Sequence, residues 1–129
     1  MNLCFIPISI GELWDKYTIL LIKKKHIQCV EKLAHVNKEI QELLPLVERY
    51  PIEKELFDKI YSINHTLWEL EDAIRDKDRA GDFGPDFVTI SRNIYQTNDK
   101  RYNAKREIND CHNSSIMEVK SYKKHGSDI

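Results

Sequence analysis

The residues that break helices are few in this chain and fall in a small number of places. Its 129 residues contain four glycines and four prolines, and neither type occurs between Pro51 and Gly81. Long stretches of this kind favour long helices over a β fold, which needs frequent turns. Apolar residues recur within them every three or four positions, as on one face of a helix. We therefore expect an all-α fold of about four long antiparallel helices, arranged as a bundle or as extended helical hairpins.

The first two helices are placed by their ends. Ser9 and Glu12 form a capping box, in which both side chains satisfy the first free amides of a helix that extends to about Ile27. The residues before Ser9 then form a short non-helical N-terminus. A second apolar stripe runs through residues 29–44. Pro45 is expected to end or kink this helix, because proline lacks the amide hydrogen that a helix interior uses.

The third and fourth helices are the longest. The third covers about 52–79 and stops at Gly81, a residue type that often follows a helix end. Asp86 is expected to cap the fourth helix, which reaches about Ile108. The helical pattern then fades, so the tail from about residue 110 is expected to be loose and less ordered. The whole chain, 1–129, is expected to form a single helical domain.

The composition argues against several classes of partner. A formal net charge of -1 gives no overall attraction to nucleic acid. No apolar run approaches the roughly 18 residues that a membrane-spanning helix needs. Three cysteines without a close pairing are typical of reduced thiols in a reducing compartment. These features predict a cytoplasmic protein that binds neither nucleic acid nor membrane.

The fourth helix carries the main anomaly of the sequence. Its inward stripe begins with the apolar residues Ile90 and Ile94 and continues at the same spacing with Asn98, Arg101 and Lys105. A polar continuation of a core face has to be paired, hydrated or functional, because an unpaired buried charge is very unfavourable. We therefore treat this stripe as the centre of a candidate site.

Folding the helices back on one another predicts which residues surround that stripe. The turn between the third and fourth helices places Asn64 at the level of Arg101, and a first helix parallel to the third brings Asp15 to the same neighbourhood. Trp68 and Tyr95 are the expected walls of a pocket there. The candidate polar cluster comprises Glu12, Asp15, Lys16, Asn64, Trp68, Glu71, Arg75, Asn98, Asp99, Arg101 and Lys105.

Two interpretations of this cluster remain open. In one, Arg101 and Lys105 form a cationic pocket that grips an anionic ligand. In the other, Asp15, Glu12 and Glu71 pair with these cations and lock the helices together. The second is the more frequent role, because structural ion-pair networks also collect such groups.

The sequence offers only incomplete metal-binding motifs. The acidic pairs Glu39-x-x-Glu42 and Glu69-x-x-Asp72 resemble those that hold Mg²⁺, but a helical hairpin separates them by about 15 Å. His26 and Cys29 offer two ligands one turn apart, whereas a structural zinc site needs four. We therefore expect no metal and no cofactor.

Long motifs cover most of the chain. They are Ile8-Ser9-Ile10-Gly11-Glu12-Leu13-x-Asp15-Lys16-x-Thr18-Ile19-Leu20, Asn64-x-x-Leu67-Trp68-x-x-Glu71-Asp72-x-Ile74-Arg75, Ala80-Gly81-Asp82-Phe83-Gly84, Tyr95-x-Thr97-Asn98-Asp99-x-Arg101-x-x-Lys105-x-x-Ile108-Asn109 and, less closely, Glu118-x-Lys120-Ser121-Tyr122. Together they resemble a family of small bacterial and phage proteins that bears only a domain-of-unknown-function label. The resemblance brings no established activity, catalytic residue or cofactor. It implies an accessory role, because members of that family are often encoded beside glycosyltransferases and surface-polysaccharide genes.

A looser similarity concerns the all-helical chorismate mutases. Their first helix also carries an acid amid apolar residues, followed by a basic group, as in Glu12-Leu13-Trp14-Asp15-Lys16. This similarity implies an arginine-rich pocket for a dianion, for which Arg75, Arg101 and Lys105 are the available residues. The early arginine of those enzymes is absent here, so the similarity is an analogy of fold.

These observations lead to two candidate functions. The first is a non-catalytic accessory or binding module, expected to form a homo-oligomer with coiled-coil contacts and to serve a protein partner in surface-glycan assembly. A second stripe of residues on the third helix supports it, because one hairpin does not cover both faces. The second is a small enzyme or metabolite-binding protein for an anionic substrate, such as a sugar phosphate or nucleotide sugar. We favour the first, because no complete catalytic constellation is present.

Overall fold

Four α-helices form the fold, and the computed structural model describes residues 2–113 and 118–122. The helices are α1 (Ile10–His26), α2 (Val30–Arg49), α3 (Lys54–Arg79) and α4 (Pro85–Cys111). The described residues contain no strand, and residues 2–9 are non-helical. The prediction of an all-α fold with about four long helices and a short non-helical N-terminus is confirmed.

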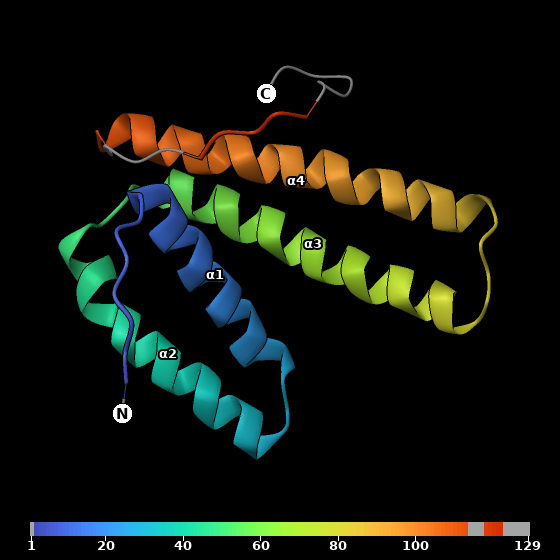
Figure 1. Cartoon of the computed structure of the whole chain (residues 1–129), viewed down its shortest axis with the longest axis horizontal. Helices are drawn as coiled ribbons and strands as arrows, with labels where there is room; N and C mark the ends of the chain where they lie inside the picture. The colour runs from blue at the N-terminus through green and yellow to red at the C-terminus, as the bar shows by residue number, and fades with distance from the viewer. Residues whose placement is uncertain (1, 114–117, 123–129) are drawn as a thin grey trace.

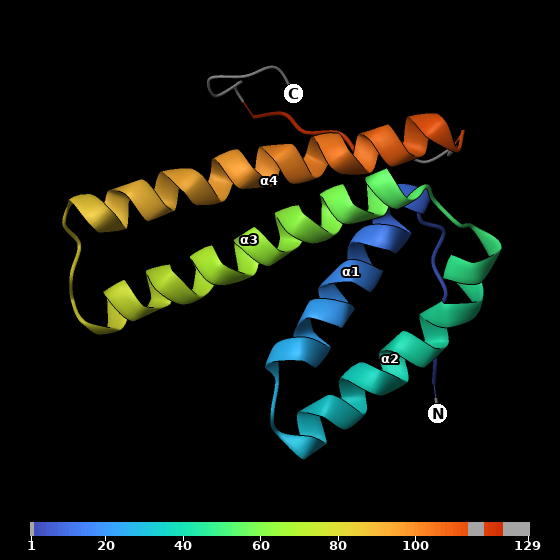
Figure 2. The same cartoon turned by 180° about the vertical axis from the view of Figure 1, so that it is seen from behind.

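The helices pair into two antiparallel hairpins (Figure 1). One hairpin consists of α1 and α2 and the other of α3 and α4, and the two diverge from the end where α1 begins (Figure 2). α1 packs against all three other helices, whereas α2 packs against α1 alone in the part of the chain that the structure describes. α1 is therefore the central element. The half of the α3–α4 hairpin that contains the turn projects beyond it.

The start of α1 and its contact with α2 follow from the sequence. The Ser9 hydroxyl accepts a hydrogen bond from the Glu12 amide at 3.0 Å, which confirms the Ser9 half of the predicted capping box. The Glu12 carboxylate contacts the ammonium of Lys105 instead of capping the helix. Further along the helix, Leu20 is buried against Val36 and Ile40 of α2. Burial of each such side chain stabilises the fold by about 1.5–3 kcal/mol. This apolar seam closes the first hairpin.

A second apolar core joins α1 to the open end of the α3–α4 hairpin, where α3 begins and α4 ends. Leu56 and Ile60 of α3 pack against Ala104 and Ile108 of α4, and Trp14 of α1 packs onto this group. Ile60 and Ile108 are completely buried. The core fixes α1 beside the C-terminal half of α4, which carries Arg101 and Lys105 of the candidate cluster.

Pro45 does not end α2, which continues through it to Arg49. Proline removes the hydrogen bond that residue 45 would donate to the carbonyl of Gln41. Both Pro45 and Gln41 are exposed, so water reaches that carbonyl. Val47 is buried beyond the proline, and its packing helps to hold the last turn in a helical conformation.

The turn between α3 and α4 differs from the expected one at its cap. Gly84 is the N-cap of α4 and Pro85 its first residue, so Asp86 lies in the first turn rather than at the cap. Proline suits this position, because the amide hydrogen it lacks is unpaired there in any residue. Gly81 has a φ of 68°, a left-handed conformation that glycine adopts without strain.

The start of α3 and the end of α4 also differ from expectation by a few residues. α3 begins at Lys54 rather than near Ile52, and α4 continues to Cys111. Residues 118–122 contain no helix and run back along α4 (Figure 1). The rest of the expected loose tail, 114–117 and 123–129, lies outside the described residues. None of the described helices is both long and apolar enough to cross a bilayer.

Candidate functional site

A buried carboxylate lies at the centre of the polar residues between α1, α3 and α4. Asp15 is 0% exposed. The Arg101 guanidinium donates to both of its oxygens, from Nε at 2.8 Å and from Nη2 at 2.5 Å. The Asn64 amide donates to Asp15 Oδ1 and to the Thr18 hydroxyl, each at 3.0 Å. We call Asp15, Thr18, Asn64 and Arg101 the central network.

The residues of the central network satisfy one another's charges and hydrogen bonds. A buried charge is strongly unfavourable unless it is paired and its remaining hydrogen-bonding positions are filled. Asp15 accepts three hydrogen bonds, and no buried side-chain polar atom of the described residues lacks a partner. The hydrogen bond to Asp15 raises the pKa of the Arg101 guanidinium, although burial acts in the opposite direction. The network therefore remains an ion pair that joins α1 to α4.

Lys105 forms a second group of ion pairs one helical turn beyond Arg101. Its ammonium lies 3.2 Å from Glu12 Oε2 and 2.6 Å from Glu118 Oε1, and the side chain is 10% exposed. Burial lowers the pKa of Lys105, but the hydrogen bond to Glu118 and the charges of Asp15 and Glu12 outweigh it, so the net shift is upward. The side chain is therefore a buried cation at neutral pH, held between α1 and the segment after α4.

α1 approaches the backbone of α4 very closely at Gly11. The Gly11 amide donates to Asn109 Oδ1 at 2.7 Å in a buried hydrogen bond. A β-carbon at Gly11 would overlap the Lys105 carbonyl oxygen and would lie 2.9 Å from Asn109 Oδ1. Only glycine fits this contact without movement of one helix. The contact sets the level at which Glu12 and Asp15 meet the cations of α4.

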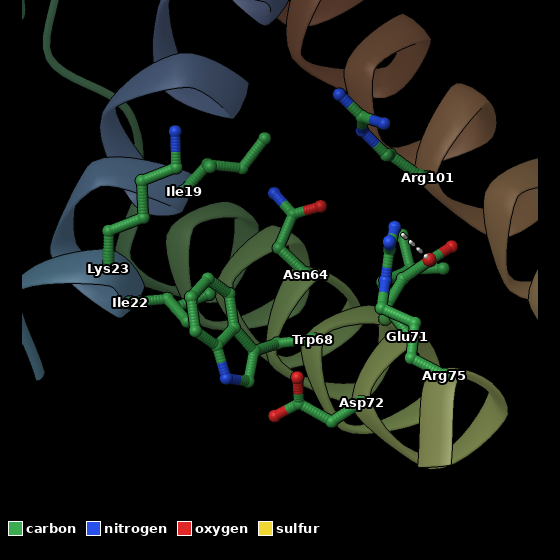
Figure 3. Close-up of a pocket in the computed structure, with 10 residues that line it drawn as sticks. Ile19, Ile22, Lys23, Asn64, Trp68, Glu71, Asp72, Arg75 and Arg101 are labelled. Atoms are coloured by element: carbon green, nitrogen blue, oxygen red, sulfur yellow. Dashed lines mark hydrogen bonds and ion pairs between the residues drawn. The ribbon is translucent and has the colours of Figure 1, made fainter. Parts of the chain in front are cut away.

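A groove opens beside the central network, between the far half of α1, the middle of α3 and Arg101 of α4 (Figure 3). Its volume is about 480 Å³, within the range of small-molecule sites. Its lining residues are Ile19, Ile22, Lys23, Asn64, Leu67, Trp68, Glu71, Asp72, Arg75 and Arg101. We call this cavity the hairpin groove.

The charged residues of the hairpin groove differ in how they are paired. Glu71 Oε2 accepts from Arg75 Nη2 at 3.1 Å along α3. Figure 3 shows Arg101 reaching toward α1, where Asp15 holds it. Lys23 stands on the α1 wall, across from Glu71 and Arg75, and among the described residues it has no carboxylate partner. The groove thus combines an apolar floor around Trp68 with a cation, Lys23, that is not paired within the described residues.

The structure divides the predicted cluster into three parts. The central network contains Asp15, Asn64 and Arg101, and the hairpin groove contains Trp68, Glu71 and Arg75 along with Asn64 and Arg101. Lys105 lies outside the groove and one turn of α4 from Arg101, with Glu12, Lys16 and Asn98 near it. Asp99 is half-buried on α4 and lines none of these cavities.

Two expected features of the cluster are wrong. Glu71 does not pair with Arg101 or Lys105, because Arg75 stands one turn along the same helix and is closer at hand. Tyr95 does not line the hairpin groove, since it is 43% exposed on α4. Trp68 does form a wall of the groove.

Four residues at these contacts were not identified as site residues from the sequence. They are Gly11, Thr18, Asn109 and Glu118. A weak signal was present, because all four belong to the long motifs, and Gly11 is an unfavourable residue within a helix. A pattern of this kind marks the positions but does not say which atoms they contact.

Comparisons with known proteins identify a family and no activity. The model of a family described as "Family of unknown function (DUF6165)" matches residues 4–128. No curated protein and no solved structure matches the chain.

Proposed function

The chain belongs to this family of unknown function, and from that premise we propose that it is a non-catalytic binding module for a small anionic sugar derivative. The hairpin groove is the proposed binding site, and sugar phosphates and nucleotide sugars are the proposed ligand class. The observation that carries the proposal is the contrast between the closed central network and the open groove beside it. In the central network the buried charges pair with one another and join the helices. The groove contains Lys23, a cation without a carboxylate partner in the described part of the chain.

The arrangement of the acids supports binding rather than catalysis. A general acid or base has to come within about 3 Å of the proton that it transfers. Asp15 is completely buried and accepts three hydrogen bonds, so it offers no free position to a substrate. Glu71 is tied to Arg75. Among the described residues that line the groove, these contacts leave Asp72 as the one carboxylate without an ion-pair partner, so a pair of acids for general acid–base catalysis is not assembled there.

The enzyme alternative has less support. A pocket like that of the all-helical chorismate mutases would need Arg75, Arg101 and Lys105 around one ligand. Arg75 and Arg101 line the hairpin groove, whereas Lys105 points to Glu12 and Glu118 outside it. Both arginines already have carboxylate partners. A dianion would therefore have to displace two ion pairs to bind there.

The lining of the groove matches the chemistry of a sugar phosphate. The half-buried side chains of Trp68, Ile19 and Leu67 offer an apolar floor, against which the C–H face of a sugar ring can pack. The Asp72 carboxylate can accept hydrogen bonds from sugar hydroxyls, as can Asn64 Oδ1, the atom of that amide that the central network does not use. The ammonium of Lys23 supplies a positive charge for a phosphate.

An accessory role in surface-glycan assembly agrees with this ligand class. A module that binds a sugar donor or acceptor without transforming it can hold that molecule for a glycosyltransferase partner. The proposal therefore joins the resemblance, which implies such a context, to a groove whose chemistry suits sugars.

The test is a binding titration with defined probes. We expect UDP-glucose or glucose 1-phosphate to bind the wild-type chain in isothermal titration calorimetry and to raise its melting temperature. Lys23→Gln and Trp68→Ala should each weaken binding by about tenfold or more, since each removes about 1.4 kcal/mol or more of contact. Lys24→Gln is the matched control, because Lys24 is exposed next to Lys23 and does not line the groove.

Two results would contradict the proposal. One is that neither the sugar probes nor citrate and other carboxylates bind at millimolar concentration. The other is binding that both groove variants leave unchanged. Consumption of a probe by the wild-type chain would instead favour the enzyme alternative.

Self-association remains a prediction. It was based on a second stripe along α3, and α1 covers part of that stripe, since Phe57 packs on Trp14 and Asn64 bonds to Asp15. The exposed apolar residues of the projecting hairpin, Phe83 and Val88 among them, are the remaining candidates for a contact between copies. Size-exclusion chromatography with light scattering measures this directly.

A further inference from the structure

Two histidines from different helices face each other on the seam between α1 and α3. His26 is the last residue of α1, and His65 lies in the middle of α3, 39 positions later. Their Nε2 atoms are 3.4 Å apart, and their ring centroids are 5.4 Å apart with an interplanar angle of 38°. The partner of His26 is therefore not Cys29, one turn along the chain, but a residue distant in sequence.

The separation of the two nitrogens matches that of two ligands on one metal ion. Two imidazole nitrogens about 2.05 Å from a tetrahedral zinc ion lie about 3.3–3.4 Å from each other. With the rings pointing at the metal, their centroids would lie about 5.2 Å apart. The observed values of 3.4 Å and 5.4 Å are close to both. The pair can thus bind a metal without a backbone movement.

The other ring nitrogen of His65 is held by an acid. His65 Nδ1 lies 3.1 Å from Glu69 Oε1, one turn along α3. A carboxylate in this position keeps the proton on Nδ1, and the lone pair of Nε2 is then directed at the metal position. Histidines that bind metals usually have such an outer partner, which orients the ring and raises its basicity.

Neighbouring rings restrict the orientation of both imidazoles. The Trp68 indole stacks on His26 at 5.2 Å with an interplanar angle of 20°, and the Tyr61 ring stacks on His65 at 6.4 Å and 15°. Rings held in this way lose little rotational freedom on binding a metal. The pair is also accessible, because His26 is exposed and His65 is half-buried.

The local charges favour a cation at one side and oppose it at the other. His26 stands at the C-terminus of α1, where the helix dipole is negative, and Glu69 adds a full negative charge. Lys24 and Lys25 precede His26 and repel a cation. Neutral imidazoles bind borderline transition metals through directed lone pairs, whereas Mg²⁺ and Ca²⁺ depend on anionic oxygens.

We propose that His26 and His65 form a surface site for a divalent transition-metal ion of the zinc, nickel or copper class. Within the described residues no third His, Cys, Asp or Glu side chain converges on the pair. The two histidines are therefore the only protein ligands in the described part of the chain, and water or an added ligand fills the other positions. The proposal does not depend on the function of the hairpin groove.

The experiment uses the full chain and Cu²⁺ as the probe. Electron paramagnetic resonance of the wild-type chain with one equivalent of Cu²⁺ is expected to show hyperfine coupling from two imidazole nitrogens. In calorimetric titrations with Ni²⁺ or Zn²⁺, His26→Ala and His65→Ala should each weaken binding by tenfold or more. Glu69→Gln should weaken it by about tenfold, as expected for loss of an outer partner.

His35→Ala provides the matched control, because His35 is an exposed histidine on α2 and should leave the affinity unchanged. Binding that survives both His26→Ala and His65→Ala would overturn the proposal, as would a Cu²⁺ spectrum with one imidazole or none. The spectrum is recorded on the wild-type chain, so the test stands even if a variant fails to fold.

Discussion

The guanidinium of Arg101 contacts both carboxylate oxygens of Asp15, although 86 residues separate the two along the chain. The side chain of Asp15 is almost fully buried, whereas the side chain of Arg101 is 30% exposed. The pair therefore joins the first helix to the last. Water is excluded from the acid but reaches part of the arginine. This asymmetry determines what each partner does when the other is removed.

Loss of the arginine should be more damaging than loss of the pair. Arg101→Met leaves a buried carboxylate without its cation and is expected to lower the free energy of unfolding by about 3–5 kcal/mol. The double variant Asp15→Leu/Arg101→Met removes the charge from both sides and should regain a large part of this loss. Urea denaturation followed by circular dichroism measures all variants in one double-mutant cycle. Additive effects of the two substitutions would contradict the described contact.

The approach of α1 to α4 predicts a large effect for a small substitution. Gly11→Ala adds one methyl group at a position where it would overlap the Lys105 carbonyl oxygen. We expect a loss of about 1–3 kcal/mol in the free energy of unfolding, as for an overpacked core. Gly84→Ala is the matched control, because its β-carbon would meet only the Asp82 carboxylate, at 3.3 Å. Alanine is favoured over glycine inside a helix, so a stabilised Gly11→Ala would show that the close contact is absent.

Lys105 makes a prediction about alkaline pH. Its pKa is raised in the folded state, so the folded chain holds this proton more tightly than the unfolded chain does. The stabilisation is fully present below the unfolded pKa of about 10.4 and is lost as pH rises through the higher folded value. The free energy of unfolding should therefore decline more steeply above about pH 10 in the wild-type chain than in Lys105→Met. Lys100→Met, an exposed lysine on the same helix, should retain the wild-type slope.

Pro45 predicts a stabilising substitution. Because α2 continues through this exposed position, Pro45→Ala restores a backbone hydrogen bond to Gln41 and should raise the free energy of unfolding by about 1–3 kcal/mol. Pro51 lies between helices, so Pro51→Ala should not raise the free energy of unfolding, since it only increases the conformational entropy of the unfolded chain. A destabilising Pro45→Ala, measured by thermal unfolding, would show that α2 does not extend to Arg49.

The level at which polar residues meet was predictable from helical geometry. A rise of about 1.5 Å per residue and one turn between α3 and α4 place Asn64 opposite Arg101, and the parallel course of α1 adds Asp15. In the structure, Asn64 and Arg101 both bond to the carboxylate of Asp15. Helical periodicity is a regular property of the chain, so it transfers from sequence to structure with little loss.

Other features depend on short-range competition that the pattern does not encode. Glu71 had several possible cations, and Arg75 on its own helix is the partner in the structure. Pro45 stays within α2 because its surroundings are exposed to water. The hairpin groove itself exists because the two hairpins diverge, and that angle is set by contacts such as Gly11 against Lys105. Spacing along the chain says nothing about such an angle.

The central place of α1 has a consequence for how the chain is made. α1 is complete after 26 residues, yet Arg101, Lys105 and Asn109 bond to it from 86, 93 and 98 positions later. During translation, α1 and α2 leave the ribosome long before these residues are synthesised. The carboxylate of Asp15 therefore stays in water until α4 has emerged. Such long-range contacts slow folding, so this domain completes its native structure only after α4 has been synthesised.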